Sequence, residues 1–553
     1  MWKQVGLSSV LVLAMANAGA VSLGTTTVLG PWVGQQAPLH PSNQSPLIQF
    51  YGTDLGFSYK HGNELKLLFG DSVGNGNDAC PIAAWTINTF CLNNWDDAFG
   101  SVDLTTYSNP STFGTTMPRV KLAQESGGNQ AWPLITEKPM DAFKTPEGGF
   151  SNGTNEFAVF IMGKPLTCAT TSECSTVNPA LSCDVSLGWW DSPPWDDHGW
   201  TGGCSDSQSG CNANTKVNSS GTPIPNTGFC VDTNSSTYSS TSTSGRLAGA
   251  AFKMRAGIRS TTDARQYTTT EFATNRFYNQ SLATVQSFIP ANGGGYANQN
   301  YNVATATGTN RRVLVWGRPG FFGINTLSRT AKLYFAYRSM PTGTGAPTWA
   351  LNYYTGTVGG IPQFSTNEAN AAPLDLDAAT AGIQSSESYD PVGQMSVVWV
   401  DQLKKWVMFY GGGLSKLPTP KFPNCGIVEA LTGADCTSVN MGNGAIRMRT
   451  ADNPWGPWAA GVDVLVGGNP NASPLQGQYQ PGGILRHPNC TASNCAPHSN
   501  MPIYSSQEYG AMYAPVIHQP WITGSATTGV DLIWSVSTWD PYRVVLLRTH
   551  LNP

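Results

Sequence analysis

Two aspartates near the start of the chain lie close enough in sequence to act together in acid–base chemistry. Asp54 belongs to Tyr51-Gly-Thr-Asp-Leu-Gly-Phe-Ser-Tyr-Lys60, and Asp71 closes Leu65-Lys-Leu-Leu-Phe-Gly-Asp-Ser72. Two carboxyl groups held side by side are what glycoside hydrolysis and several metal-assisted reactions require. The alternative is that both are turn residues whose side chains accept backbone N–H bonds, because Asp is favoured in turns.

The elements that would position these aspartates form a β-hairpin. The residues after Asp54 alternate as in a half-buried strand, His61-Gly-Asn63 supplies a turn, and residues 65–69 form an apolar return strand. Asp54 and Asp71 are therefore expected near the same end of two adjacent strands. Three glycines leave room for a ligand beside them, at Gly52, Gly56 and Gly70.

The composition predicts an all-β protein. Among 553 residues there are 60 Gly, 38 Pro and 18 Trp, and only 12% are charged, which is typical of short strands joined by many turns. Apolar strands recur in about five groups of three or four, the pattern of a β-propeller. We therefore expect one five-bladed β-propeller over residues 48–553, with a large β-sandwich as the rival architecture.

The N-terminus indicates export. Residues 1–20 combine Lys3, an apolar centre over 10–16 and small residues that suit cleavage, as in a secretory signal peptide. Residues 21–47 are rich in Gly, Pro and Thr and predict an extended lead-in before the propeller. No later stretch reaches about 18 apolar residues, so we expect a secreted protein without a membrane partner.

The twelve cysteines predict disulfide bonds, because an exported protein folds in an oxidising compartment. Six of them fall within a long interruption at 164–245, which we expect to be a disulfide-tied insertion, serving as a lid or rim for substrate. No Cys/His spacing matches a zinc site. The run from Asp191 to His198 fits no metal-binding loop either, so we expect neither metal nor cofactor.

Charge excludes one class of partner. The formal net charge is −4, and Lys and Arg are scattered without a basic cluster, so nucleic acid is not an expected partner. We expect the protein to be a monomer.

Six motifs, in order along the chain, resemble the domain-of-unknown-function 4185 family, which includes endo-D-arabinanases that cut the D-arabinan of mycobacterial cell walls. The resemblance covers about 48 to 549 and is most specific in the last motif. The motifs are Thr53-Asp-Leu-Gly56 with Leu68-Phe-Gly-Asp-Ser72, Val315-Trp-Gly317, Met395-Ser-Val-Val-Trp399, Arg449-Thr-Ala-Asp-Asn-Pro-Trp-Gly-Pro-Trp458, Tyr509-Gly-Ala-Met-Tyr513 and Ser537-Thr-Trp-Asp-Pro-Tyr-Arg-Val-Val-Leu-Leu-Arg548.

The resemblance implies a five-bladed propeller whose central face holds a sugar, with Asp54 and Asp71 as catalytic carboxylates. It therefore implies a glycoside hydrolase that cleaves arabinofuranosyl linkages in D-arabinan or a related polysaccharide. Asp54 is expected as the base and Asp71 as the acid, although the roles could be exchanged. The chain departs from the family pattern in the insertion and in Arg318-Pro-Gly-Phe-Phe-Gly323, which leaves the substrate more open than the reaction.

Two other classes compete with this interpretation. A non-catalytic carbohydrate-binding or adhesive propeller would keep the fold without needing both carboxylates in one pocket. An esterase or sulfatase-like hydrolase is disfavoured, because no Gly-x-Ser-x-Gly elbow or formylglycine-type Cys motif is present.

Further polar residues are candidates for contact with substrate, each with a structural alternative. Asp390 precedes a proline and could instead form a turn, and Trp539 lies in the closing motif beside Pro541, which favours a turn. Four more residues precede or belong to the last group of strands and could equally have core or hydrogen-bonding roles: Glu508, Tyr509, Tyr513 and His518.

Overall fold

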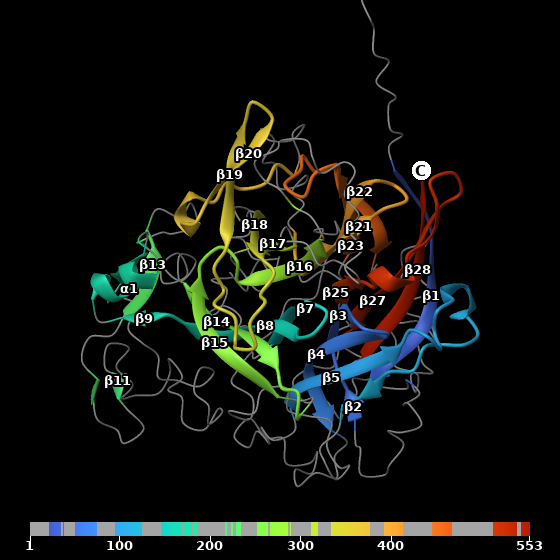
Figure 1. Cartoon of the computed structure of the whole chain (residues 1–553), viewed down its shortest axis with the longest axis horizontal. Coiled ribbons are helices and arrows are strands. Elements are labelled where there is room, and N and C mark those ends of the chain that lie inside the picture. The colour runs from blue at the N-terminus through green and yellow to red at the C-terminus, as the bar shows by residue number, and fades with distance from the viewer. Residues whose placement is uncertain are drawn as a thin grey trace, which may run out of the picture.

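The computed structural model is an all-β protein in which five sheets are arranged in a ring around a central axis, which confirms the predicted five-bladed propeller (Figure 1). The structure describes residues 21–34, 37, 50–74, 95–123, 145–168, 170–177, 179, 181–184, 216–217, 223–224, 228–233, 240, 251–263, 266–285, 288, 311–318, 333–376, 392–412, 445–466, 512–538 and 543–553.

Each of these five sheets forms one blade, and its strands follow one another outwards from the central axis. Blade 1 contains β3 (Leu55–His61), β4 (Glu64–Gly74), β5 (Trp95–Asp103) and β6 (Lys121–Leu122), with β2 (Phe50–Gly52) also paired to β4. Blade 2 contains β7 (Thr145–Ser151), β8 (Glu156–Pro165), β14 (Phe252–Arg259) and β15 (Tyr267–Thr274). Blade 3 contains β16 (Asn279–Val285), β17 (Arg312–Arg318), β18 (Tyr334–Ser339), β19 (Asn352–Val358) and β20 (Ile361–Ser365).

The last two blades complete the ring. Blade 4 contains β21 (Met395–Val400), β22 (Lys405–Gly412), β23 (Ala445–Ala451) and β24 (Val462–Val466). Blade 5 contains β25 (Met512–Ile517), β26 (Thr523–Ser525), β27 (Gly529–Thr538), β28 (Arg543–Asn552) and β1 (Ser22–Gly34). Each innermost strand packs on the next around the ring, in the order β3, β7, β16, β21, β25 and back to β3.

The ring is closed by the N-terminal strand, which corrects one prediction. Residues 21–47 were expected to form an extended lead-in outside the propeller. Residues 22–34 are indeed extended, but as β1 they pair with β28 and form the outermost strand of blade 5. Blade 5 therefore combines both ends of the described chain.

The core consists of apolar layers between neighbouring blades. In β22, Trp406 and Met408 pack towards blade 3, whereas Val407 and Phe409 pack towards blade 5. Successive side chains of a strand point to opposite faces, and both faces of this blade are covered. Burial on both faces explains why β22 is a nearly continuous apolar run.

Hydrogen bonds from side chains connect innermost strands that share no backbone ladder. The Ser281 hydroxyl accepts from Val397 N at 3.0 Å, joining blade 3 to blade 4. The Ser396 hydroxyl accepts from Ile517 N at 3.0 Å, joining blade 4 to blade 5. These bonds satisfy buried N–H groups that the sheets leave unpaired.

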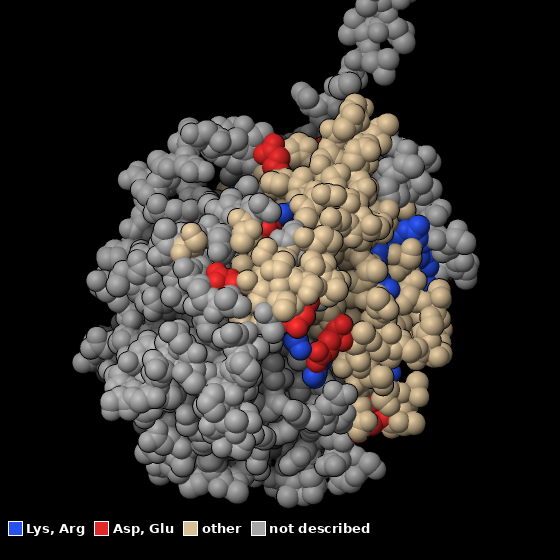
Figure 2. Space-filling model, turned by 90° about the vertical axis from the view of Figure 1, so that its left-hand side faces the viewer, with Lys and Arg blue, Asp and Glu red and all other residues tan. Residues whose placement is uncertain are grey.

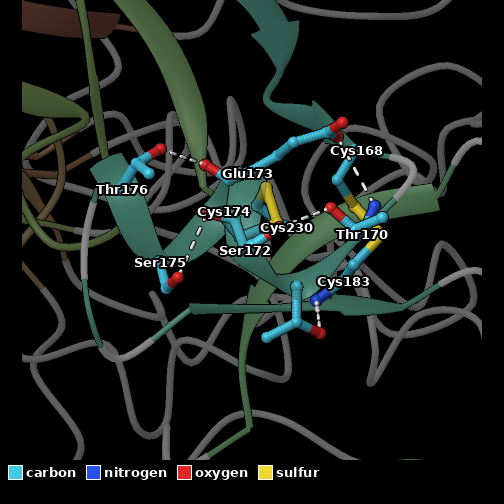
Figure 3. Close-up of a disulfide and its surroundings, with 10 residues drawn as sticks. Cys168, Thr170, Ser172, Glu173, Cys174, Ser175, Thr176, Cys183 and Cys230 are labelled. Atoms are coloured by element: carbon cyan, nitrogen blue, oxygen red, sulfur yellow. Dashed lines mark hydrogen bonds between the residues drawn. A yellow bond between two sulfur atoms is a disulfide. The ribbon is translucent and has the colours of Figure 1, made fainter.

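The predicted disulfide-tied insertion leaves blade 2 after β8 and returns at β14 (Figure 1). Its described elements are β9 (Thr167–Cys168), α1 (Thr171–Val177), β10 (Leu181–Asp184), β11 (Lys216–Val217), β12 (Pro223–Ile224) and β13 (Gly228–Asp232). Disulfides join Cys168 in β9 to Cys183 in β10, and Cys174 in α1 to Cys230 in β13, so three strands and the helix are linked covalently (Figure 3). The other eight cysteines lie outside the described residues.

On the face shown in Figure 2, acidic side chains are scattered over the central part of the described surface, and several basic side chains group together towards the right-hand edge. Within the described ranges, no helix has the length and apolarity needed to cross a membrane.

Candidate active site

Asp54 lies at the start of the innermost strand of blade 1 and is only 6% exposed. The hairpin predicted around it is confirmed, because β3 pairs with β4 and Leu55 lies opposite Phe69. The backbone N–H of Gly70 donates to the Asp54 carbonyl at 3.2 Å. The backbones at Asp54 and Asp71 therefore lie close together, at the same end of the two paired strands.

A tyrosine from blade 5 holds the Asp54 carboxylate. The Tyr513 hydroxyl donates to Asp54 Oδ2 at 2.8 Å, across 459 residues of sequence. On the other side, Asp54 Oδ1 faces Gly70, where an added Cβ would lie 2.4 Å from that oxygen. Gly70 thus provides the space that the carboxylate occupies, as its position beside both aspartates predicted.

The backbone is strained directly after Asp54 and directly after Tyr513. Leu55, directly after Asp54, has φ +65°, and Ala514, directly after Tyr513, has φ +48°. A left-handed conformation costs a non-glycine residue roughly 1–2 kcal/mol. The third described non-glycine residue with positive φ is Lys404, which lies in the exposed turn between β21 and β22. Strain of this kind is typical of functional sites, where the surroundings hold it in place.

Blade 5 also fastens the backbone at this position. The Ser537 hydroxyl accepts from Leu55 N at 2.6 Å. Thr53 and Ser72 share a buried hydroxyl–hydroxyl bond at 2.8 Å, and the Ser72 hydroxyl also donates to the Gly70 carbonyl. The residues on either side of Asp54 and Asp71 are therefore fixed.

Asp71 lies in β4 at an irregularity in the sheet. Between β4 and β5, the register advances from Phe69 opposite Ala98 to Ser72 opposite Asp96, so β4 contains one extra residue. Such bulges bend the strand and redirect its side chains, and they are frequent beside active sites. The backbone of Asp71 thus lies in a bulge next to Asp54, while its side chain lies outside the described residues.

Two further buried acids near these strands escaped the sequence analysis. Asp97 is 1% exposed and lies in β5 opposite the bulge. Glu147 lies in β7, the innermost strand of blade 2, is fully buried, and accepts from Gln280 N at 2.7 Å. Burial raises the pKa of Glu147 well above its ordinary value, although Gln280 N–H and the charge of Arg318 oppose the shift. Glu147 therefore keeps its proton at a higher pH than a solvated glutamate.

His518, predicted as a possible substrate contact, lies in the core instead. It is fully buried, its Nδ1 bonds to the Ser58 hydroxyl at 2.9 Å, and its ring packs edge-on against Trp32 and Trp521. Burial lowers the pKa of His518 to about 3, so the ring is neutral near pH 7. Ser58 lies four residues along the chain from Asp54, so His518 bonds to β3 at a point away from the Asp54 end of the strand.

The structure places one of the remaining candidates beside Asp54. Tyr513 is brought to Asp54, as described above, and its role as a substrate contact stays a prediction. The other four candidates lie outside the described residues: Asp390, Glu508, Tyr509 and Trp539.

A separate polar cluster lies between blades 1 and 2, near the other end of β3. Glu156 accepts from the Tyr59 hydroxyl at 2.9 Å and from Arg259 Nη1 at 2.5 Å. Arg259 also stacks over the Phe99 ring at 4.1 Å. Both Glu156 oxygens are thus engaged, and we interpret the cluster as a fastening between the two blades.

The described residues provide no metal-binding group apart from three cysteine sulfurs within 4.8 Å of one another, those of Cys168, Cys174 and Cys183. All three are bonded in disulfides, so they do not fit a metal ion.

Comparisons with known proteins give distant similarities. No family model matches the chain, and no curated protein matches it in sequence. Among solved structures, it is similar to a putative hydrolase from Bacteroides ovatus, with 10% identity, 91% of this chain and 86% of that chain covered, and a TM-score of 0.35. It is also similar to an N-acetylgalactosamine deacetylase from F. plautii, with 8% identity, coverage of 97% and 96%, and a TM-score of 0.36.

A third similar structure is a thermostable family-43 glycoside hydrolase, with 8% identity, coverage of 90% and 89%, and a TM-score of 0.26. At these scores none of the three assigns a function to this chain, so the function is inferred from the site.

Proposed function

We propose that this protein is a secreted glycoside hydrolase that cleaves arabinofuranosyl linkages in D-arabinan or a related polysaccharide. The observation that carries the proposal is the Asp54 carboxylate, which is held by Tyr513, backed by Gly70 and followed by strained backbone at Leu55. A carboxylate that only closed a turn would not need a partner from another blade. The arabinan substrate is supported by the six motifs that resemble the endo-D-arabinanase family.

In the proposed reaction, Asp54 is the base. A hydrogen bond from Tyr513 to the carboxylate favours its ionised form, which suits a group that takes a proton from water. Asp71, next to it in the β4 bulge, is proposed as the acid that protonates the departing glycosidic oxygen. The water oxygen bonds to the anomeric carbon as the glycosidic C–O bond breaks, and solvent later restores both protonation states.

The pairing of β3 with the bulged strand β4 gives a physical reason why Asp54 and Asp71 take the different roles of base and acid. Acid–base hydrolysis needs one carboxyl group ionised and the other protonated at the same pH. Asp54 and Asp71 come from paired strands whose backbones meet at Gly70. In a pair of carboxyl groups held close together, the charge of the first makes the second retain its proton more readily. The two groups are thus suited to act as a pair.

The proposal is tested with mycobacterial arabinogalactan and the variants Asp54→Asn and Asp71→Asn. The wild type should release a ladder of arabino-oligosaccharides, and each variant should lose at least about 100-fold in rate, since general acid or base catalysis contributes about 10²–10⁴-fold. Full activity in either variant would contradict the assigned pair. Wild-type protein that binds the polysaccharide without cleaving it would instead support a non-catalytic carbohydrate-binding propeller.

A further inference from the structure

Two of the described non-glycine residues with positive φ directly follow the two residues whose side chains meet. Leu55 follows Asp54 in blade 1, and Ala514 follows Tyr513 in blade 5. Both are almost fully buried, at 1% and 0% exposure, and both belong to the same apolar cluster around β3 and β25. The strain is therefore paired across the junction between the first and last blades.

We propose that Tyr513 is a positioning residue that fixes the direction of the Asp54 carboxylate and keeps it ionised, and that the strained backbone at Leu55 and Ala514 holds the two side chains in contact. This inference rests on the proposed function, because it assigns Tyr513 a role in the reaction of that same site. It differs from the expectation that Tyr513 contacts the substrate.

The position of the bond supports this role. No backbone ladder joins β25 to β3, because the two strands belong to different sheets. Among the described residues, side-chain hydrogen bonds connect blade 5 to blade 1 at this end: one from Tyr513 in β25 to Asp54, and one from Leu55 N to the Ser537 hydroxyl in β27. A tyrosine ring has few rotatable bonds, so a ring packed beside this cluster presents its hydroxyl in one direction.

The backbone conformation supports it further. Neither Leu nor Ala adopts the left-handed region without cost, so these conformations persist only where neighbouring contacts determine them. At Leu55 the contacts are the Ser537 bond and the buried side chain over Gly70. At Ala514 the left-handed residue coincides with a register irregularity between β25 and β27, after Tyr513. A regular strand would point Tyr513 differently, so the irregularity aims it at Asp54.

The chemistry is that of a hydroxyl donating to a charged oxygen. Such bonds are shorter and stronger than bonds between neutral groups, and they stabilise the ionised carboxylate relative to the protonated acid. Tyr513 keeps its own proton throughout, while Asp54 takes one proton from water during hydrolysis. Loss of the phenol hydroxyl should make Asp54 protonate at higher pH and leave its carboxylate able to rotate.

The variant Tyr513→Phe removes only the hydroxyl. On mycobacterial arabinogalactan, kcat should fall about 10- to 100-fold with KM changed less than about threefold, and the acidic limb of the pH–rate profile should move up by about one pH unit. The matched control is Tyr410→Phe, since Tyr410 is a buried tyrosine of blade 4 that accepts a bond from Arg449 away from the site. The control should retain the wild-type limb.

Two further measurements keep the inference testable if Tyr513→Phe folds poorly or the substrate is wrong. Ala514→Gly removes no hydrogen-bonding group but frees the backbone, so kcat should fall while the melting temperature changes little. In ¹³C-aspartate-labelled protein, the Asp54 carboxyl signal is identified by its absence from Asp54→Asn, and its titration midpoint should rise by about one pH unit in Tyr513→Phe.

The outcomes separate the two proposals. If Asp54→Asn cleaves as fast as the wild type, the proposed function fails whatever Tyr513 does. If Asp54→Asn is inactive but Tyr513→Phe and Ala514→Gly keep the wild-type kcat and acidic limb, only the positioning role is overturned. An Asp54 titration midpoint that is unchanged in Tyr513→Phe also overturns it, independently of any activity.

Discussion

Replacing Gly70 by alanine should displace the Asp54 carboxylate with little effect on the rest of the propeller. A Cβ at this position would lie 2.4 Å from Asp54 Oδ1 and 2.7 Å from Leu55 Cδ1, whereas ordinary van der Waals contacts begin at 3.4 Å. The φ of Gly70 lies outside the left-handed region, so alanine fits the backbone and the effect is purely steric. The carboxylate must therefore move by about 1 Å or Leu55 must shift.

Neither the Asp54 carboxylate nor the Leu55 side chain can move freely. Asp54 has a short side chain whose other oxygen is held by Tyr513, and Leu55 is buried, with its N–H bonded to Ser537. A displacement of 1 Å at a catalytic group can cost about 100-fold in rate, whereas overpacking of this size destabilises by about 1–3 kcal/mol. We therefore expect Gly70→Ala to lose about 100-fold in kcat and to remain folded.

The assay compares the release of reducing ends from arabinogalactan with the urea midpoint of unfolding. The matched control is Gly114→Ala, in the loop between β5 and β6 of the same blade, where an added Cβ meets nothing within 4 Å. This control should change stability by less than about 0.5 kcal/mol and leave kcat unchanged. Folded Gly70→Ala with the wild-type kcat would refute the claim that the packing around Asp54 sets its catalytic position.

Two further predictions concern stability. His518 is neutral in the folded protein, with a pKa of about 3, and takes up a proton in the unfolded chain below about pH 6.5, so stability should fall by about 1.4 kcal/mol per pH unit as the pH drops from 6.5 towards 3. Urea titrations should show a shallower fall for His518→Asn, and equal slopes would count against the buried neutral ring. The Cys174–Cys230 disulfide closes a separation of 56 residues, so Cys174→Ser with Cys230→Ser should cost about 4 kcal/mol in the chain-entropy account. Hydrogen exchange should then speed up in β10 and β13 but not in β27, and uniform acceleration would show that the insertion and propeller unfold together.

The hairpin that carries Asp54 and Asp71 could be predicted from the sequence, because the residues that determine it are close together in the chain. The hairpin around Asp54 has alternating side chains, a Gly62 turn and an apolar return strand, and β3 and β4 follow these limits closely. The propeller followed from repeated groups of strands that are apolar on both faces. The strand β1 was missed as part of a blade, because its Thr- and Gly-rich sequence forms a strand only by pairing with β28 at the other end of the chain.

The contacts that make the site specific could not be predicted. The bond between Tyr513 and Asp54 spans 459 residues, and neither Leu55 nor Ala514 is a residue type that announces positive φ. Glu147 lies in Thr145-Pro-Glu-Gly-Gly149, whose proline and glycines indicate a turn rather than an inner strand. An acidic residue directly before two glycines is the one signal that could have drawn attention to it.

The central claim is tested most directly by one comparison. Wild-type protein and Asp54→Asn, at equal concentration and with matching unfolding midpoints, are incubated with mycobacterial arabinogalactan, and the new reducing ends are counted over time. We predict steady release by the wild type and at least about a 100-fold slower release by Asp54→Asn. Equal rates from the two proteins, or no release from the wild type, would contradict it.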